Sequence, residues 1–337
     1  MKNIKKIFLF GGTVSLVEAA ILLKKRNFDY YIFTSRRQLK DKIIDSSLSL
    51  EQALKNNKLN YKVCKNINTD KFFKKKFDSN SLGLGFGEPW KFSNYFIKKF
   101  RGKLIDFMCI PLPLFRGGAH YTWMSLMGVK KTSICLQEIT ENTLQGIFDD
   151  GQIFLKKEFK IKKNSKPSIF FDLERKNTSA LLKFFFDCIV NKKEIKKVPV
   201  NEKKSLFLPR LFTPKNGWIN WQWSGKDILS FINSFDEPYI GSSTRYIENS
   251  RTKKLVLLKD ASWEDKKIKF HPFQSGFIIN KNLKSIIVAT TDGSIKINKV
   301  LDEKNNDIKK NLDIGRRLYS SNADLEISMT HCPIYNR

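Results

Sequence analysis

The chain has 337 residues, 41% hydrophobic and 13% aromatic, which is enough to bury sizeable cores and is typical of two domains. Lys and Arg number 62 against 33 Asp and Glu, which gives a net charge of +29. Such a charge attracts nucleic acid, acidic membrane surfaces or phosphorylated molecules. The alternative interpretation is an AT-rich genome that favours Lys. Five cysteines without a Cys-x-x-Cys pair, and three histidines without ligand spacing, argue against disulfides and a metal centre and indicate a cytoplasmic protein.

The chain opens with a strand–turn–helix–strand unit. Residues 4–10 form an apolar run that ends in Gly11-Gly12, residues 14–25 have the spacing of a helix, and residues 28–33 read as a second strand. This unit predicts a doubly wound, mostly parallel α/β sheet. The Gly-Gly turn lacks the full Gly-x-Gly-x-x-Gly spacing, so we interpret it as a tight turn rather than a dinucleotide site. The glycines also interrupt the apolar start, which favours a buried strand over a secretory signal.

Further elements follow in a regular order. No run of about 18 apolar residues is present, so we expect no membrane span. A charged linker at 191–205 separates a first domain at 1–190 from a second domain at 206–325. The second domain has short β-type runs split by Asn-Lys and Asp-Gly turns, which predicts a small antiparallel barrel. The expected strands are 61–64, 81–86, 104–109, 132–137, 256–258, 276–279, 285–289 and 294–300, and the expected helices are 50–56, 90–100 and 177–190.

The most informative segment follows the expected strand at 104–109. Residues 112–118 read Leu-Pro-Leu-Phe-Arg-Gly-Gly. This segment resembles the loop of the 10-formyltetrahydrofolate-dependent formyltransferases, which usually reads Asn-x-His-Pro-Ser-Leu-Leu-Pro-x-Tyr-Arg-Gly at the end of a buried strand. Counting back from Arg116 places Asp106 where that family has its Asn and Met108 where it has its His.

Other segments extend the resemblance over residues 4 to about 318. The sequence at 148–153 is similar to a family loop that carries a catalytic Asp, here Asp149, and 85–90 (Gly-Phe-Gly-Glu-Pro-Trp) is similar to the loop that holds the pterin. Residues 209–221 and 228–241 are similar to the start of the family's C-terminal domain. The resemblance implies 10-formyltetrahydrofolate as co-substrate. It implies these binding residues: Gly85, Gly87, Pro89, Trp90, Pro111, Leu112, Pro113, Arg116 and Gly117.

The substitutions at the family's catalytic positions question the chemistry that the resemblance implies. An ionised Asp106 cannot donate to the oxyanion formed in formyl transfer, and the Met108 thioether neither donates well nor carries a proton. Losing one oxyanion donor typically costs about 2.7–4 kcal/mol. Two rescues are open: Asp106 is kept protonated by a neighbouring Asp149, or His120 takes over the imidazole role. The alternative to a protonated Asp106 is a pseudo-active site. The alternative for His120 is a structural role at the start of a helix.

Three functions therefore compete. The sequence predicts a formyltransferase of one-carbon metabolism that acts on methionyl-tRNA in protein biosynthesis, because the two-domain match is accompanied by a basic surface suited to tRNA and a basic loop at 35–40. The alternatives are formylation of an amino sugar on a nucleotide sugar, favoured by the divergent Arg-Gly-Gly-Ala-His stretch, and a non-catalytic folate-binding module, favoured by Asp106 and Met108. The sequence gives no prediction for the oligomeric state.

Overall fold

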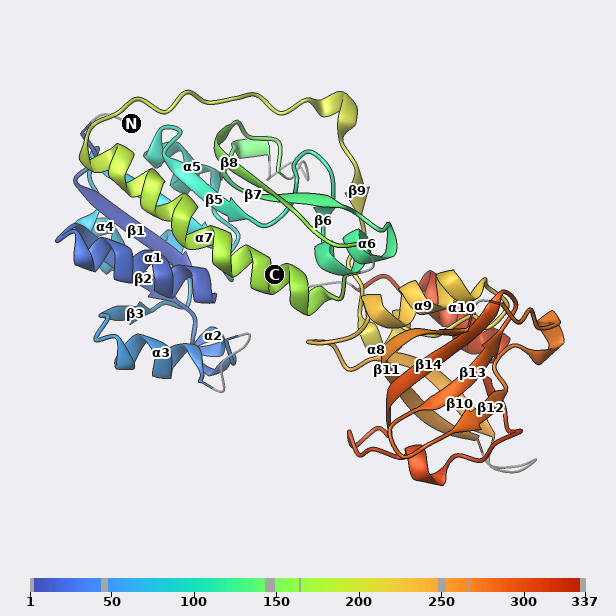
Figure 1. The fold of residues 1–337 in the computed structure, drawn as a ribbon. Helices are drawn as coiled ribbons and strands as arrows, with labels where there is room; N and C mark the ends of the chain where they lie inside the picture. The colour runs from blue at the N-terminus through green and yellow to red at the C-terminus, as the bar shows by residue number, and fades with distance from the viewer. Residues whose placement is uncertain are drawn as a thin grey trace.

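The computed structural model describes residues 3–43, 48–142, 149–163, 165–247, 253–265 and 267–333. Two sheets, each with its own core, account for most of the described chain (Figure 1). The first sheet has seven strands in the order β3-β2-β1-β4-β5-β7-β8. These are β1 (Lys6–Gly11), β2 (Asp29–Thr34), β3 (Tyr61–Val63), β4 (Ser81–Phe86), β5 (Leu104–Met108), β7 (Lys131–Glu138) and β8 (Ile153–Lys160).

The first sheet is mostly parallel. Strands β1 to β5 pair parallel, whereas β7 and β8 are antiparallel. Every residue of β4 is buried, as expected for a strand that helices cover on both faces. The doubly wound, mostly parallel architecture predicted from the sequence is therefore confirmed.

Helices cover both faces of this sheet, and the types of side chain buried beneath them differ between the two faces. On one face α1 (Val14–Lys25) and α7 (Pro167–Val190) lie side by side over an aliphatic core (Figure 1). On the other face α4 (Lys71–Lys76) and α5 (Asn94–Phe100) supply phenylalanines that pack edge-to-face against those of β1 and β2. The remaining helices of this part are α2 (Arg36–Lys40), α3 (Leu50–Asn56) and α6 (His120–Leu126).

Most predicted elements of the first part are present, and two bounds are wrong. The helix expected at 90–100 begins only at Asn94, because the Ser93 hydroxyl accepts from the Phe96 N–H and caps the helix there. The helix expected at 177–190 begins ten residues earlier at Pro167, a residue suited to the first turn of a helix. Strand β8 was not predicted, although its buried and exposed residues alternate over much of its length.

The second sheet is antiparallel and barrel-like. Its six strands run in the order β12-β13-β14-β11-β10-β15, and a bridge between Phe277 and Arg317 joins β12 to β15 across its open side. This confirms the predicted barrel-like second sheet. The strands are β10 (Ser242–Ile247), β11 (Lys253–Asp265), β12 (Ile278–Lys281), β13 (Ile286–Thr290), β14 (Gly293–Leu301) and β15 (Leu318–Tyr319), with helices α8 (Thr213–Asn216), α9 (Gly225–Ser234) and α10 (Asn322–Thr330).

Two kinds of contact join the parts built on the two sheets. Helix α6 packs on α9, where the Ser125 and Ser234 hydroxyls lie 2.8 Å apart, and the Lys166 ammonium at the start of α7 pairs with the Asp236 carboxylate at 2.8 Å. The segment after α7 also runs back over the first part and forms β9 (Phe207–Leu208), which pairs parallel with β6 (Arg116–Gly117). The boundaries at 190 and 205 stay a prediction.

Candidate active site

The predicted loops meet at the carboxyl edge of the parallel sheet, where ligands of doubly wound folds bind. The segment after β4 and the segment after β5 leave the sheet from adjacent strands. Gly11, at the end of β1, has a φ of +128°, and a Cβ there would overlap the Phe86 carbonyl. The glycine turn is therefore required by close strand packing, in agreement with the interpretation of a tight turn.

Asp106 faces a second carboxylate that the sequence did not single out. A Cβ at Gly85 would lie 2.7 Å from Oε2 of Glu88 and 3.0 Å from Oδ1 of Asp106, so both side chains converge on the bare glycine. Gly85 and Asp106 are also register partners in the β4–β5 pair. Glycine is needed here because any side chain would displace one of the two carboxylates.

Asp149 shares its surroundings with Asp106. Cys135 is register partner of Met108 in the β5–β7 pair and is fully buried. Burial raises the pKa of the Cys135 thiol far above its usual range, and the charges of Asp106 and Asp149 act in the same direction. Both carboxylates are therefore close enough to act on one buried sulfur. The structure thus brings Asp106, Met108 and Asp149 to one end of β5.

The Asp149 segment is fixed by hydrogen bonds to β7. The Gln137 side chain donates to the Asp149 carbonyl at 2.7 Å and to the Gly151 carbonyl at 2.8 Å. Thr140 donates to the Asp150 carboxylate at 2.6 Å. Asp149 has a φ of +58°, a left-handed conformation that Asp tolerates better than most residues. Residue 148, the first of the predicted loop at 148–153, lies outside the described residues.

The segment after β4 combines an anchored end with an exposed glycine. The buried Trp90 ring packs in the phenylalanine core and its indole N–H donates to the Lys65 carbonyl at 3.1 Å. The Gln38 amide donates to the Gly87 carbonyl at 2.8 Å. Gly87 has a φ of +67° and is exposed, and a Cβ there would have only Thr13 within 4 Å. A flat ring could therefore approach the backbone closely at Gly87.

Arg116 is held by the segment that follows α7. Its buried guanidinium donates two hydrogen bonds to the Glu202 carboxylate, at 2.7 and 2.8 Å, and one to the Ser205 hydroxyl at 3.0 Å. The hydrogen bonds from Arg116 hold the pKa of Glu202 below its usual range. Asp149 and Asp150 also act on Arg116 through their charge. Residues 112–118 form the signature that resembles the family loop. Its Arg116 therefore lies between the segment that follows α7 and the Asp149 loop.

The two glycines after Arg116 allow the same segment to pass. A Cβ at Gly117, where φ is +101°, would overlap the Leu208 carbonyl, and a Cβ at Gly118 would overlap the side chain of Arg210. The Gly118 N–H donates to the Leu208 carbonyl at 3.2 Å. The Arg-Gly-Gly sequence is thus explained by close packing of the 202–210 segment on the signature.

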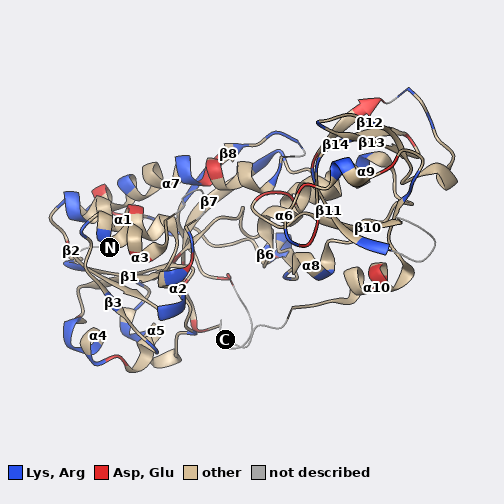
Figure 2. Cartoon of the chain, turned by 90° about the horizontal axis from the view of Figure 1, so that it is seen from below, with Lys and Arg blue, Asp and Glu red and all other residues tan. Residues whose placement is uncertain are grey.

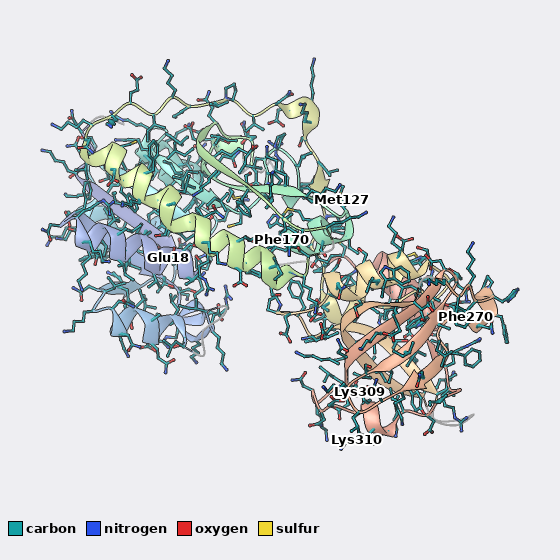
Figure 3. All side chains as sticks on the ribbon, in the orientation of Figure 1. Glu18, Met127, Phe170, Phe270, Lys309 and Lys310 are labelled. Carbon is teal, nitrogen blue, oxygen red and sulfur yellow. The ribbon has the colours of Figure 1, made fainter. Side chains whose placement is uncertain are left out.

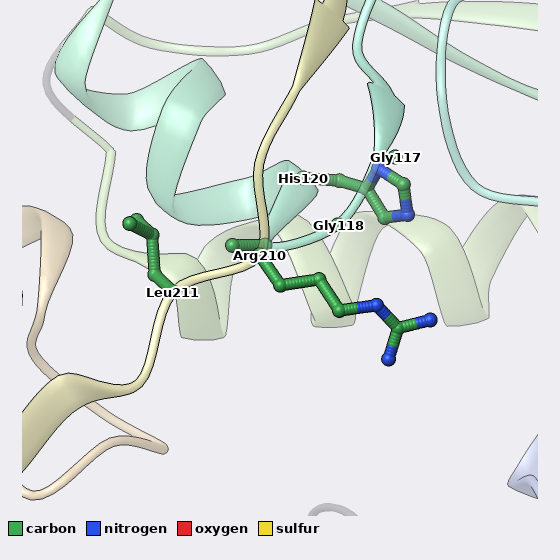
Figure 4. A pocket seen from close by; sticks show the side chains of 6 residues that line it. Gly117, Gly118, His120, Arg210 and Leu211 are labelled. Atoms are coloured by element: carbon green, nitrogen blue, oxygen red, sulfur yellow. The ribbon is translucent and has the colours of Figure 1, made fainter. Parts of the chain in front are cut away.

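His120 lies in a separate pocket of about 230 Å³ (Figure 4). It begins α6, and its Nδ1 lies 2.9 Å from the Phe115 carbonyl, so the imidazole donates from Nδ1. Burial, together with the charge of Arg210, lowers the pKa of His120 below its usual value. His120 is thus a helix-start residue that also faces a pocket.

A buried polar cluster beneath the signature was missed at the sequence level. Ser15, Cys109 and Tyr121 donate to the Glu174 carboxylate of α7, and burial raises the pKa of Glu174. Glu18 lies on α1 beside α7 (Figure 3), and burial raises its pKa to about 7. The residues of this cluster come from segments up to 160 positions apart, and only their fold neighbourhood could have revealed them.

Within the described ranges, no His, Cys, Asp and Glu side chains gather into a group of three able to hold a metal ion. The helices in those ranges include none with the length and apolarity to cross a membrane.

Comparisons with known proteins agree with this arrangement. Residues 212–312 match the family described as formyl transferase, C-terminal domain. A curated relative, the bifunctional polymyxin resistance protein ArnA of Wigglesworthia glossinidia brevipalpis, is 25% identical over 188 residues, which are 55% of this chain and 26% of that protein. The chain thus spans about a quarter of that relative's length.

Solved structures share the fold at low identity. The N-formyltransferase from Helicobacter canadensis, in complex with folinic acid and dTDP-3-aminofucose, is 15% identical with a TM-score of 0.65, over 88% of this chain and 99% of that one. WlaRD, a sugar 3N-formyl transferase studied with dTDP and 5-N-formyl-THF, is 15% identical with a TM-score of 0.62, over 88% and 97%. A 4-N formyltransferase from Francisella tularensis is 14% identical with a TM-score of 0.58, over 76% and 98%.

The parallel sheet followed by a barrel-like second sheet is the fold that these solved formyltransferases share with this chain. The domain match assigns a formyl transferase C-terminal domain to residues 212–312, and the solved structures share the fold of most of the chain.

Proposed function

We propose that the protein transfers a formyl group from 10-formyltetrahydrofolate to the amine of a nucleotide-linked amino sugar. The observation that carries the transfer is that Asp106 and Asp149 both lie near enough to the buried Cys135 thiol, the register partner of Met108 at the end of β5, for their charges to act on it. Support for the sugar acceptor comes from the fold neighbours, whose own ligands include dTDP-3-aminofucose and dTDP.

The residues present fit a folate at this edge. The exposed Gly87 leaves room for a flat ring, and the family resemblance assigns Pro111, Leu112 and Pro113 to the same folate site. The buried Nε of Arg116 has no hydrogen-bond partner among the described residues, so it is a donor left for a ligand. Bound there, 10-formyltetrahydrofolate would supply the formyl group.

The chain's own groups would handle the proton and the developing negative charge. Asp149 occupies the position of the family's catalytic Asp and would accept the proton of the attacking amine. Asp106 stands where the family has its Asn, and we propose that its carboxyl group keeps a proton beside Glu88 and donates the hydrogen bond that the Asn provides. Met108 contributes no donor, so the predicted activity rests on these two carboxyl groups.

Methionyl-tRNA is the second candidate acceptor. Lys and Arg side chains are spread over both parts of the molecule (Figure 2), and α2, which carries Arg36, Arg37 and Lys40, directly follows β2. Such a surface suits a polyanion.

A turnover assay distinguishes the two candidate acceptors. We would mix the protein with 10-formyltetrahydrofolate and either a dTDP-linked 3-amino sugar or charged initiator tRNA, and follow release of tetrahydrofolate. Release with the amino sugar alone supports the proposal, and release with tRNA alone assigns the second candidate. Folate binding by calorimetry without release in either mixture assigns the non-catalytic folate-binding alternative.

A further inference from the structure

The pocket beside the signature is built around a cation from the 202–210 segment. Its walls are Gly117, Gly118, Ala119 and His120 on one side and Arg210 and Leu211 on the other. Arg210 and His120 extend toward the same side of this pocket (Figure 4). Arg210 is close enough for its charge to lower the pKa of His120.

The position of Arg210 is fixed by the signature itself. The carbonyls of the two preceding residues accept hydrogen bonds: Leu208 from the Gly118 N–H at 3.2 Å, and Pro209 from the Trp123 indole N–H at 2.8 Å. The aliphatic stem of Arg210 lies on Gly118, where any Cβ would overlap it. The guanidinium is therefore carried on an anchored backbone rather than on a solvated loop.

The imidazole of His120 is oriented as well. Its Nδ1 donates to the Phe115 carbonyl at 2.9 Å, which fixes the ring and leaves Nε2 as the second, protonatable nitrogen. A cation beside a buried imidazole disfavours protonation, whereas an anion bound between the two would favour it. Within the described ranges, the charged side chain that acts on His120 is Arg210.

We propose that Arg210 and His120 form an anion subsite that takes the diphosphate of the nucleotide-linked acceptor. The arginine fork matches phosphate oxygens, and His120 adds a donor at Nε2 when it is protonated. The subsite starts at Gly117, next to Arg116, whose guanidinium senses Asp149. An acceptor held here by its phosphates would lie beside the candidate catalytic edge. The inference rests on the proposed function for the identity of the acceptor.

The test is binding of dTDP-glucose, which has the diphosphate but no amine, and whose phosphates do not titrate near neutral pH. Calorimetry would compare the parent with Arg210→Gln, Arg210→Lys and His120→Ala, after circular dichroism shows that each is folded. Lys215→Gln is the matched control, because Lys215 is an exposed cation five residues further along the chain. We expect Arg210→Gln to weaken binding roughly tenfold to a hundredfold, since it removes charge-assisted hydrogen bonds.

The pH dependence separates a specific subsite from a general basic surface. Bound phosphate raises the pKa of His120, so parent affinity should rise as pH falls through the bound-state value, and the rise should be absent in His120→Ala. Equal affinities of the parent and Arg210→Gln, or an equal loss in Lys215→Gln, would overturn the proposal. The proposal would also be overturned if the parent showed no binding of dTDP-glucose at millimolar concentration but bound tRNA through Arg210. Binding through Arg210 without formyl transfer would leave the subsite standing and refute the proposed activity.

Discussion

Replacing Glu202 by Gln tests whether the segment after α7 supports the signature. The Arg116 side chain is 6% exposed and the Glu202 side chain 56% exposed, so the pair has one buried partner and one hydrated partner. Breaking a fully buried pair costs about 3–5 kcal/mol, whereas exposed pairs contribute about 0–1 kcal/mol. Because water can reach Glu202 but not Arg116, we expect Glu202→Gln to lower the free energy of unfolding by about 1–2 kcal/mol.

The assay is urea denaturation at pH 7 and at pH 4, with Glu194→Gln as control. Glu194 is an exposed acid of the same segment. The pKa of Glu202 is held below its usual value in the folded protein, so its contribution is present above about pH 4.5 and is lost as pH falls through the folded pKa. The difference between parent and Glu202→Gln should therefore shrink at acid pH. A Glu202→Gln variant as stable as Glu194→Gln at pH 7 would refute the reasoning.

Three further outcomes are expected. Asp149→Asn should lower formyl transfer on the order of 10²–10⁴-fold in steady-state assays, and unchanged turnover would place the proton acceptor elsewhere. Asp106→Asn combined with Met108→His should raise turnover above the parent and above either single change, because His supplies the donor that Met108 lacks and Asn donates at any pH; a slower double variant would indicate a mechanism built on Asp106. Glu18→Gln should stabilise the protein by on the order of 2 kcal/mol at pH 8 but not at pH 4.5. The reason is that burial raises the pKa of Glu18 from 4.5 to about 7, so ionising this carboxyl costs stability only as pH rises between these two values. Equal urea midpoints of parent and variant at pH 8 would contradict this.

The local elements could be predicted because short-range signals specify them. The helices at Val14–Lys25 and Leu50–Asn56 and the strand at Ser81–Phe86 have the predicted bounds, since each is delimited by a glycine, a cap or a turn. The start of α7 was missed because Lys166 precedes it and its first ten residues contain Asp172, Glu174, Arg175 and Lys176, which look solvated in sequence. In the fold Lys166 pairs with Asp236, and Glu174 accepts hydrogen bonds from distant donors.

The site was predicted only as far as the resemblance reached. Asp106 and Asp149 were found from the order of motifs, but Glu88, which lies near Asp106, was given no role of its own within the pterin-like loop at 85–90. Sequence spacing could not show that Glu88 folds back over Gly85 toward Asp106. The rescue of Asp106 that we proposed from Asp149 therefore has a second source, in a residue three positions after the glycine that both carboxylates contact.

The signature of this chain is best understood as half of an interface within the molecule. Gly117 and Gly118 lack side chains because Leu208 and Arg210 lie where a Cβ would be, and Arg116 is paired with Glu202. The same contacts that hold the segment also present Arg210 to the pocket beside His120. Because that segment leads directly into the barrel-like second sheet, the second part of the molecule helps to place the cation beside the site, even though the candidate catalytic carboxylates all belong to the first.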